Sequence, residues 1–64
     1  MFWMVYVEGR REPRKKHPSL ELAHAEAERL ACLPENIGKK VWVLVTIGCC
    51  ELPTGQPRWT YFYQ

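Results

Sequence analysis

The chain has 64 residues, of which 47% are hydrophobic and 25% are charged, and its formal net charge is +2. This composition is typical of an ordinary globular domain and excludes a disordered chain. A chain of this length has room for one modest core, so we expect residues 1–64 to form a single domain. The small net charge does not by itself indicate a polyanionic partner.

The sequence shows no targeting or membrane segment. No apolar run approaches the roughly 20 residues of a membrane-spanning helix. Residues 1–7 are apolar, but they are too few for a signal peptide and lack a basic start. The three cysteines are an odd number and Cys49 adjoins Cys50, which fits a reducing compartment better than a disulfide framework. We therefore expect a cytoplasmic protein that makes no membrane contact.

Residues 2–7, Phe-Trp-Met-Val-Tyr-Val, are aromatic and β-branched and predict a first strand. Alternation along this strand gives it two apolar faces. One face holds Trp3, Val5 and Val7, and the other holds Phe2, Met4 and Tyr6. Residues 10–17 follow as a basic connection that Pro13 interrupts, and they could pair only as an edge strand.

Residues 19–33 predict a helix. Ser19 is a good N-cap, because its hydroxyl can accept a hydrogen bond from an unpaired backbone N–H. Leu33-Pro34 ends the helix, since proline cannot continue it. At roughly 100° per residue, one stripe collects mostly small residues that would let the helix approach a sheet closely. These residues are Leu20, Ala23, Ala27, Leu30 and Ala31.

Residues 41–50 predict the longest strand, which is apolar on both faces and is therefore expected at the centre of the sheet. A turn-rich segment, Leu-Pro-Thr-Gly-Gln-Pro at 52–57, indicates a hairpin. Residues 58–63 then predict the last strand, with Trp59, Tyr61 and Tyr63 on one face.

The expected fold is α+β, with two layers in the order β-α-β-β and one helix on one face of a small, mostly antiparallel sheet. A right-handed crossover would make the first strand parallel to the long strand. An alternative is a meander in which the basic connection pairs with the first strand.

One helix can cover only one face of such a sheet, so the second apolar face should stay open. The candidates for this open face are Phe2, Met4, Tyr6, Trp42, Leu44, Tyr61 and Tyr63. A surface enriched in Tyr, Trp and Met has the composition of an interface core. We expect it to bind a partner protein or a second copy of the chain as a homodimer.

A basic cluster lies next to the aromatic residues in the sequence. Its members are Arg10, Arg11, Arg14, Lys15 and Lys16. Such a cluster could hold a phosphate backbone while bases stack on Tyr6 or Tyr61, which predicts a single-stranded nucleic-acid-binding protein as the alternative function. The competing interpretation is a solvated loop balanced by the acidic helix.

The sequence indicates neither a metal site nor an enzyme. Adjacent Cys49 and Cys50 point to opposite faces of a strand, and the paired Cys or His spacings of structural zinc sites are missing. We expect no metal or cofactor, and the cysteines to be small buried or half-buried thiols. No nucleophile–base set or glycine-rich phosphate loop is present, so we expect no catalysis.

The helix carries the pattern H-x-S-x₃-A-x₂-E-A-x-R-L-A, which runs from His17 to Ala31. Together with the following Trp42-Val43-Leu44, it resembles small uncharacterised proteins encoded by phages and prophages. The resemblance implies no catalytic residues. It implies a protein that binds host or phage machinery, such as an inhibitor of a defence system of the anti-CRISPR kind.

We therefore expect a non-enzymatic protein–protein interaction module of phage origin. Its concrete form would be an anti-CRISPR-like inhibitor that binds a host or phage protein in the host cytoplasm. The expected binding residues lie on the open sheet face and in the basic cluster. They are Phe2, Met4, Tyr6, Arg10, Arg11, Arg14, Lys15, Lys16, Trp42, Tyr61 and Tyr63.

Overall fold

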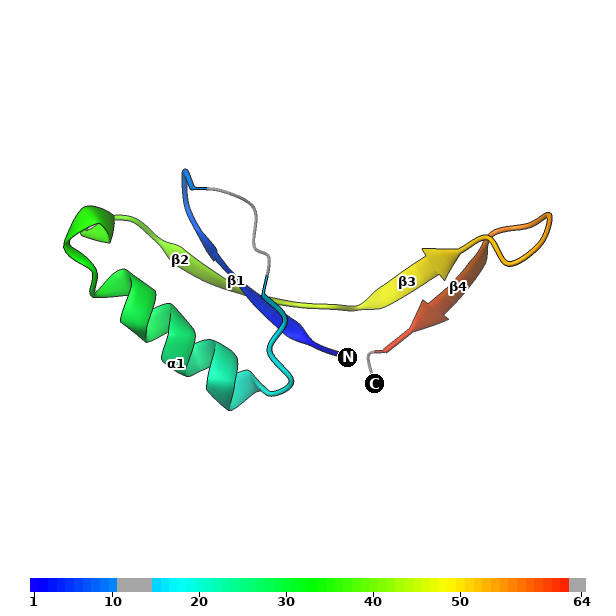
Figure 1. Ribbon diagram of the computed structural model, residues 1–64, viewed down its shortest axis with the longest axis horizontal. Helices are drawn as coiled ribbons and strands as arrows, with labels where there is room; N and C mark the ends of the chain where they lie inside the picture. The colour runs from blue at the N-terminus through cyan, green and yellow to red at the C-terminus, as the bar shows by residue number, and fades with distance from the viewer. Residues whose placement is uncertain (11–14, 63–64) are drawn as a thin grey trace.

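The computed structural model of the protein describes residues 1–10 and 15–62. Its elements in chain order are β1 (Trp3–Val7), α1 (Leu20–Ala31), the 3-10 helix η1 (Pro34–Asn36), β2 (Val41–Val45), β3 (Gly48–Glu51) and β4 (Arg58–Tyr61). The strands form two antiparallel pairs, β1–β2 and β3–β4 (Figure 1). The predicted α+β class is confirmed, and α1 packs against β1 and β2. The single sheet of the prediction is wrong, because the strands divide into two sheets.

Helix α1 begins where the sequence predicts, after the N-cap Ser19, and ends at Ala31, two residues before the predicted Leu33. The Leu22 N–H donates to the Ser19 hydroxyl at 3.2 Å, so Ser19 caps the first turn. Leu33 follows the C-cap and has extended backbone before Pro34, which starts η1. On the predicted stripe Ala23 is fully buried, whereas Leu20 is exposed at the helix start. The close approach expected from small residues is therefore centred on Ala23.

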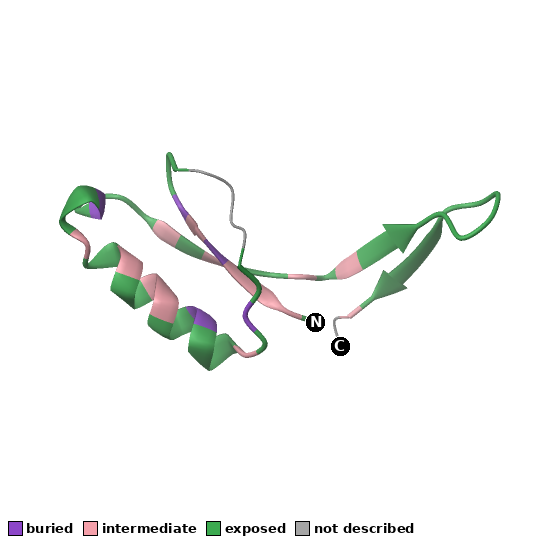
Figure 2. Ribbon diagram, viewed as in Figure 1, coloured by how far each residue is buried: buried purple, intermediate pink, exposed green. Residues whose placement is uncertain are grey.

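The core lies between α1 and one face of the β1–β2 sheet. In β1 the buried residues are Val5 and Val7, which alternate with partly exposed ones. Their cross-strand partners Val43 and Val41 share this face and are half-buried. Figure 2 shows buried positions on β1, on the segment before α1, on α1 and on η1, and none in the described residues of the two other strands, β3 and β4. The fold thus has one small core on one side of one sheet.

The predicted parallel pairing of the first two strands is wrong, because β1 and β2 run antiparallel. The reason is the segment before the helix. His17 and Trp3 exchange two backbone hydrogen bonds, of 2.8 and 2.9 Å, in an antiparallel bridge. The connection therefore returns along β1, and α1 begins beside the start of that strand and ends near its far end. The meander alternative, in which the basic connection pairs with the first strand, is confirmed at this bridge.

The predicted long central strand is also wrong, because residues 41–50 belong to two sheets. The Thr46 N–H donates to the Phe2 carbonyl at 3.0 Å, which continues the β1–β2 pairing by one position. The Phe62 N–H donates to the Ile47 carbonyl at 2.9 Å, which belongs to the β3–β4 pairing. The extended chain thus changes partner between adjacent residues, and β2 and β3 each pair with one strand in the described part of the chain.

The result is an elongated molecule with extents of 49 × 23 × 16 Å. We call α1, η1 and the β1–β2 sheet the body, and residues 48–61, which form β3, β4 and their loop, the arm. The arm projects away from the body, and α1 lies on the opposite side of the molecule (Figure 1). Every arm residue from 49 to 61 is exposed.

Candidate binding surface

Among the described residues, no helix or strand packs on the face of the β1–β2 sheet opposite α1, where Phe2, Met4 and Tyr6 are half-buried and Trp42 and Leu44 are exposed. We call it the open face. Its apolar members are Phe2, Met4, Tyr6, Trp42 and Leu44, of which Met4 pairs with Leu44 and Tyr6 with Trp42. Trp42 is 45% exposed and Leu44 is 43% exposed. The structure therefore brings five of the seven predicted open-face residues together.

Charged groups border the two ends of the open face. Lys16 Nζ lies 4.7 Å from the centre of the Phe2 ring, and Lys40 Nζ lies 5.8 Å from that of Trp42. The Trp42 indole N–H donates to the Glu8 carboxylate at 2.8 Å, which fixes the ring across the two strands. A cation that lies over an aromatic ring is attracted to it modestly at an exposed site. The open face is thus an apolar strip with a lysine at each end, and Lys40 shares its end with the Glu8 carboxylate.

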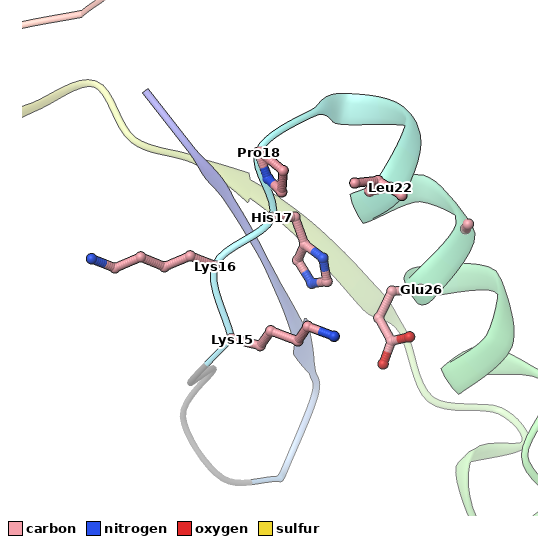
Figure 3. A pocket seen from close by; sticks show the side chains of 7 residues that line it. Lys15, Lys16, His17, Pro18, Leu22 and Glu26 are labelled. Carbon is pink, nitrogen blue, oxygen red and sulfur yellow. The ribbon is translucent and has the colours of Figure 1, made fainter.

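The three described members of the predicted basic cluster do not gather on this face. The Arg10 guanidinium donates to the Asn36 side-chain oxygen at 3.5 Å and so points to η1. Lys15 lines a pocket beside α1 and faces Glu26 (Figure 3). Lys16 reaches Phe2 on the open face. Arg11 and Arg14 lie outside the described residues. The three described cations of the cluster therefore lie in three different places: at η1, beside α1 and on the open face.

The prediction that Tyr61 shares the open face is wrong, because β4 belongs to the second sheet. Tyr61 pairs with Gly48 in the arm, and its ring stacks on Trp59 with centroids 6.0 Å apart and planes 10° apart. Tyr63, the other C-terminal candidate, lies outside the described residues. The aromatic residues of the last strand thus form a separate surface on the arm.

A shallow pocket of about 280 Å³ lies where the basic connection meets α1 (Figure 3). Its lining residues are Lys15, Lys16, His17, Pro18, Leu22, Ala25 and Glu26. Hydrogen bonds from Arg29, of 2.7 and 3.0 Å, lower the pKa of the Glu26 carboxyl below its ordinary value. The Glu26 carboxylate is therefore engaged outside the pocket by an arginine of its own helix.

The cysteines differ from the prediction. Cys32, Cys49 and Cys50 are free thiols and all three are exposed, not buried or half-buried. Cys32 is the C-cap of α1, and the other two lie in β3, which no helix covers. In the part of the chain that the structure describes, no three His, Cys, Asp or Glu side chains meet in a group that could hold a metal ion.

Sequence reasoning missed three residues that shape the binding surface or support it. Glu8 and Lys40 flank Trp42, and the alternation of β1 and β2 would have placed both on the open face had it been continued by one residue. Asn36 is 1% exposed and holds η1 against the helix end. No periodic signal marks it, because it lies in a turn between two regular elements.

The chain has no match among protein-family models, curated proteins or solved structures. In residues 1–10 and 15–62 no helix has both the length and the apolar character needed to cross a membrane. A functional proposal for this protein must therefore start from its own exposed surfaces.

Proposed function

We propose that this protein is a non-enzymatic protein-interaction module and that the open face is where its partner binds. The exposed apolar strip of the β1–β2 sheet, with Trp42 and Leu44 nearly half exposed opposite the helix, is the observation that carries the proposal. Contiguous apolar surface of this kind is uncommon on small monomers and is typical of interaction sites. Aromatic residues and methionine are also enriched in interface cores.

The border of the strip adds selectivity. Lys16 lies at the end of the strip away from the Glu8 carboxylate, where it would favour a partner with a carboxylate at its rim. Glu8 holds the Trp42 ring in one position through its 2.8 Å hydrogen bond, so less side-chain freedom is lost when a partner packs on it. An ordered aromatic anchor with a polar rim is the arrangement found at energetically important interface positions.

The partner class follows from the resemblance to small phage-encoded proteins. We propose a host protein in the bacterial cytoplasm, and a component of a defence system as its concrete form. Binding that blocks such a component needs only a complementary surface and no chemistry. The proposal therefore agrees with a chain whose described residues hold an exposed apolar face.

Affinity capture with matched variants tests this function. The bait is the intact protein, compared with Leu44→Ser on the open face and Leu52→Ser on the arm loop, where Leu52 is 66% exposed. We expect the native chain and L52S to capture the same host protein, and L44S to lose most of it. Equal capture by L44S and L52S would refute the open face as the binding site.

A plating assay tests the defence-system version separately. Expression of the protein in a host that restricts a phage should raise the number of plaques, and expression of L44S should not. If no restriction system is relieved by the native protein, the anti-defence version is wrong even where capture succeeds. Circular dichroism of each variant checks that α1 is intact.

A second candidate function is single-stranded nucleic-acid binding, which the lysines beside Phe2 and Trp42 favour, since bases stack on aromatic rings and phosphates pair with cations. Fluorescence anisotropy of a labelled oligonucleotide over a salt series tests it. Binding that weakens as salt rises, and weakens further in Lys16→Ala and Lys40→Ala, supports this candidate. No binding at low salt excludes it.

A further inference from the structure

Among the described residues, no helix and no third strand packs on the arm. It has two short strands, and no residue from 49 to 61 is buried or half-buried (Figure 2). A single two-stranded hairpin is marginally stable at best in water, and a further layer is normally needed to hold it. The arm therefore lacks the second layer that α1 provides for the β1–β2 sheet.

The two faces of the arm differ in chemistry. Register and alternation put Gly48, Cys50, Trp59 and Tyr61 on one face, which we call the arm face. None of these four is charged, and Trp59 and Tyr61 are 60% and 57% exposed. The opposite side carries Glu51 and Arg58, which approach each other at 3.6 Å.

Gly48 keeps the arm face flat. It lies opposite Tyr61, and a β-carbon at this position would stand 2.5 Å from the Thr60 carbonyl oxygen and 3.1 Å from the Tyr61 ring. The absent side chain leaves that space to the ring, which stacks on Trp59 with planes 10° apart. The two nearly parallel, stacked rings thus lie together on one face of a thin sheet.

The body of the same molecule cannot cover this surface without losing hydrogen bonds. The Thr46 hydroxyl donates to the Phe2 carbonyl at 3.0 Å and accepts from the Phe2 N–H at 2.9 Å. Ile47, the next residue, already pairs with Phe62. Between body and arm, Thr46 and Ile47 are both paired, so neither is free to make a reverse turn that would fold the arm face onto the body.

The total exposed surface of the chain is larger than that of a compact protein of the same mass. The chain exposes 5299 Å². A compact protein of 7.6 kDa exposes about 4,300 Å². The excess of about 1,000 Å² exceeds the about 800 Å² that each partner contributes to a stable complex. The radius of gyration, 14.7 Å, is likewise larger than the about 11 Å of a compact domain of this length.

We infer that the arm face pairs with the arm face of a second copy of this chain, which forms a two-fold symmetric dimer. In such a contact the same patch of both copies meets, so a face that carried charges of one sign would repel itself. The arm face carries no charge, and the Glu51–Arg58 pair lies on the outside. The two hairpins then form a four-stranded, two-layered unit with the Trp59 and Tyr61 rings between the layers.

This dimer goes beyond the proposed function and does not depend on it. It differs from pairing through the open face, because it leaves Trp42 and Leu44 free on both copies. The dimer would present two open faces to partners, and two linked sites can bind a repeated target more tightly than one. The body and the arm would thus have separate tasks.

The adjacent cysteines of β3 allow a direct test. Cys50 lies on the arm face opposite Trp59, and Cys49 lies on the other face opposite Thr60. Two single-cysteine chains, C32S/C49S and C32S/C50S, are treated with a short bismaleimide cross-linker. We expect a covalent dimer when only Cys50 remains and little when only Cys49 remains. Equal cross-linking of both chains would overturn the arrangement.

Light scattering and sedimentation of the complete chain give the second readout. We expect a concentration-dependent dimer whose dissociation constant rises by more than about tenfold in Trp59→Ser. Trp42→Ser on the open face is the matched control and should leave it unchanged. A native chain that is monomeric at the highest concentration reached, or a dimer lost in W42S and kept in W59S, refutes the proposal. Helical ellipticity confirms that the body stays folded.

Discussion

Asn36 holds the end of the helix to the following turn, and its replacement by alanine should weaken the body. The side chain is 1% exposed, and its amide N–H donates to the Leu30 carbonyl at 2.8 Å. Its own backbone N–H donates to Leu33 at 2.9 Å. Asn36 thus lies where α1 ends, and it fixes the direction in which the chain leaves toward β2.

The loss of unfolding free energy in Asn36→Ala depends on which hydrogen bonds the neighbouring groups keep. The Leu30 carbonyl still accepts the Leu33 N–H at 3.2 Å in the variant, so no buried acceptor is left without a donor. The 3.5 Å contact from Arg10 is too long to add much. Losing one good hydrogen bond and a few buried atoms therefore costs about 1–2 kcal/mol of unfolding free energy. In a domain of this length that lowers Tm by about 5–15 °C.

The assay is thermal and urea unfolding followed by helical ellipticity, with Asn36→Ala compared to Glu35→Ala. Glu35 lies in the same turn and is exposed, so its variant should stay within about 0.5 kcal/mol of the native chain. A loss in N36A no larger than that of E35A would show that Asn36 does not hold the helix end. A loss above about 4 kcal/mol would show that the turn carries more of the core than these contacts provide.

The remaining predictions concern α1. Ala23→Leu should cost about 1–3 kcal/mol in urea unfolding, because Ala23 is fully buried against the sheet, and Ala31→Leu on the exposed last turn should cost far less. Glu26→Gln should lower stability at neutral pH and match the native chain in acid. The pKa of Glu26 is lowered by its hydrogen bonds to Arg29, so this stabilisation is complete above the ordinary pKa of 4.5 and is lost as the pH falls through the lowered value. A difference that persists at low pH would contradict this assignment.

Local signals in the sequence predicted the local structure. Ser19 and Pro34 mark the two ends of the helix region, and the small size of Ala23 predicted the close approach of α1. The alternation of residues 2–7 separated the core face from the open face correctly. The turn residues at 52–57 predicted the hairpin between β3 and β4. Each of these features depends on neighbours within a few positions.

Pairing between distant segments could not be predicted in the same way. The apolar pattern continues through Thr46 and Ile47, so nothing in the composition marks the change of partner from β1 to β4. A strand that is apolar on both faces usually lies at the centre of a sheet. Residues 41–50 are apolar for two different reasons. One side of β2 packs against the helix, and the apolar side of β3 belongs to a separate hairpin. The prediction that Tyr61 lies on the open face depends on one continuous strand over residues 41–50, and it is wrong because that strand changes sheet.

The three tryptophans lie in three different parts of the molecule, which has a consequence for how its unfolding is measured. Trp3 lies on the helix side of β1, Trp42 on the open face and Trp59 on the arm. Because the arm makes few contacts with the body, the monomer has no reason to melt as one cooperative unit. Chains that keep one tryptophan each would report fluorescence transitions for core, surface and arm separately. A single free energy of unfolding therefore describes this chain only when a bound molecule couples the unfolding of the arm to that of the body.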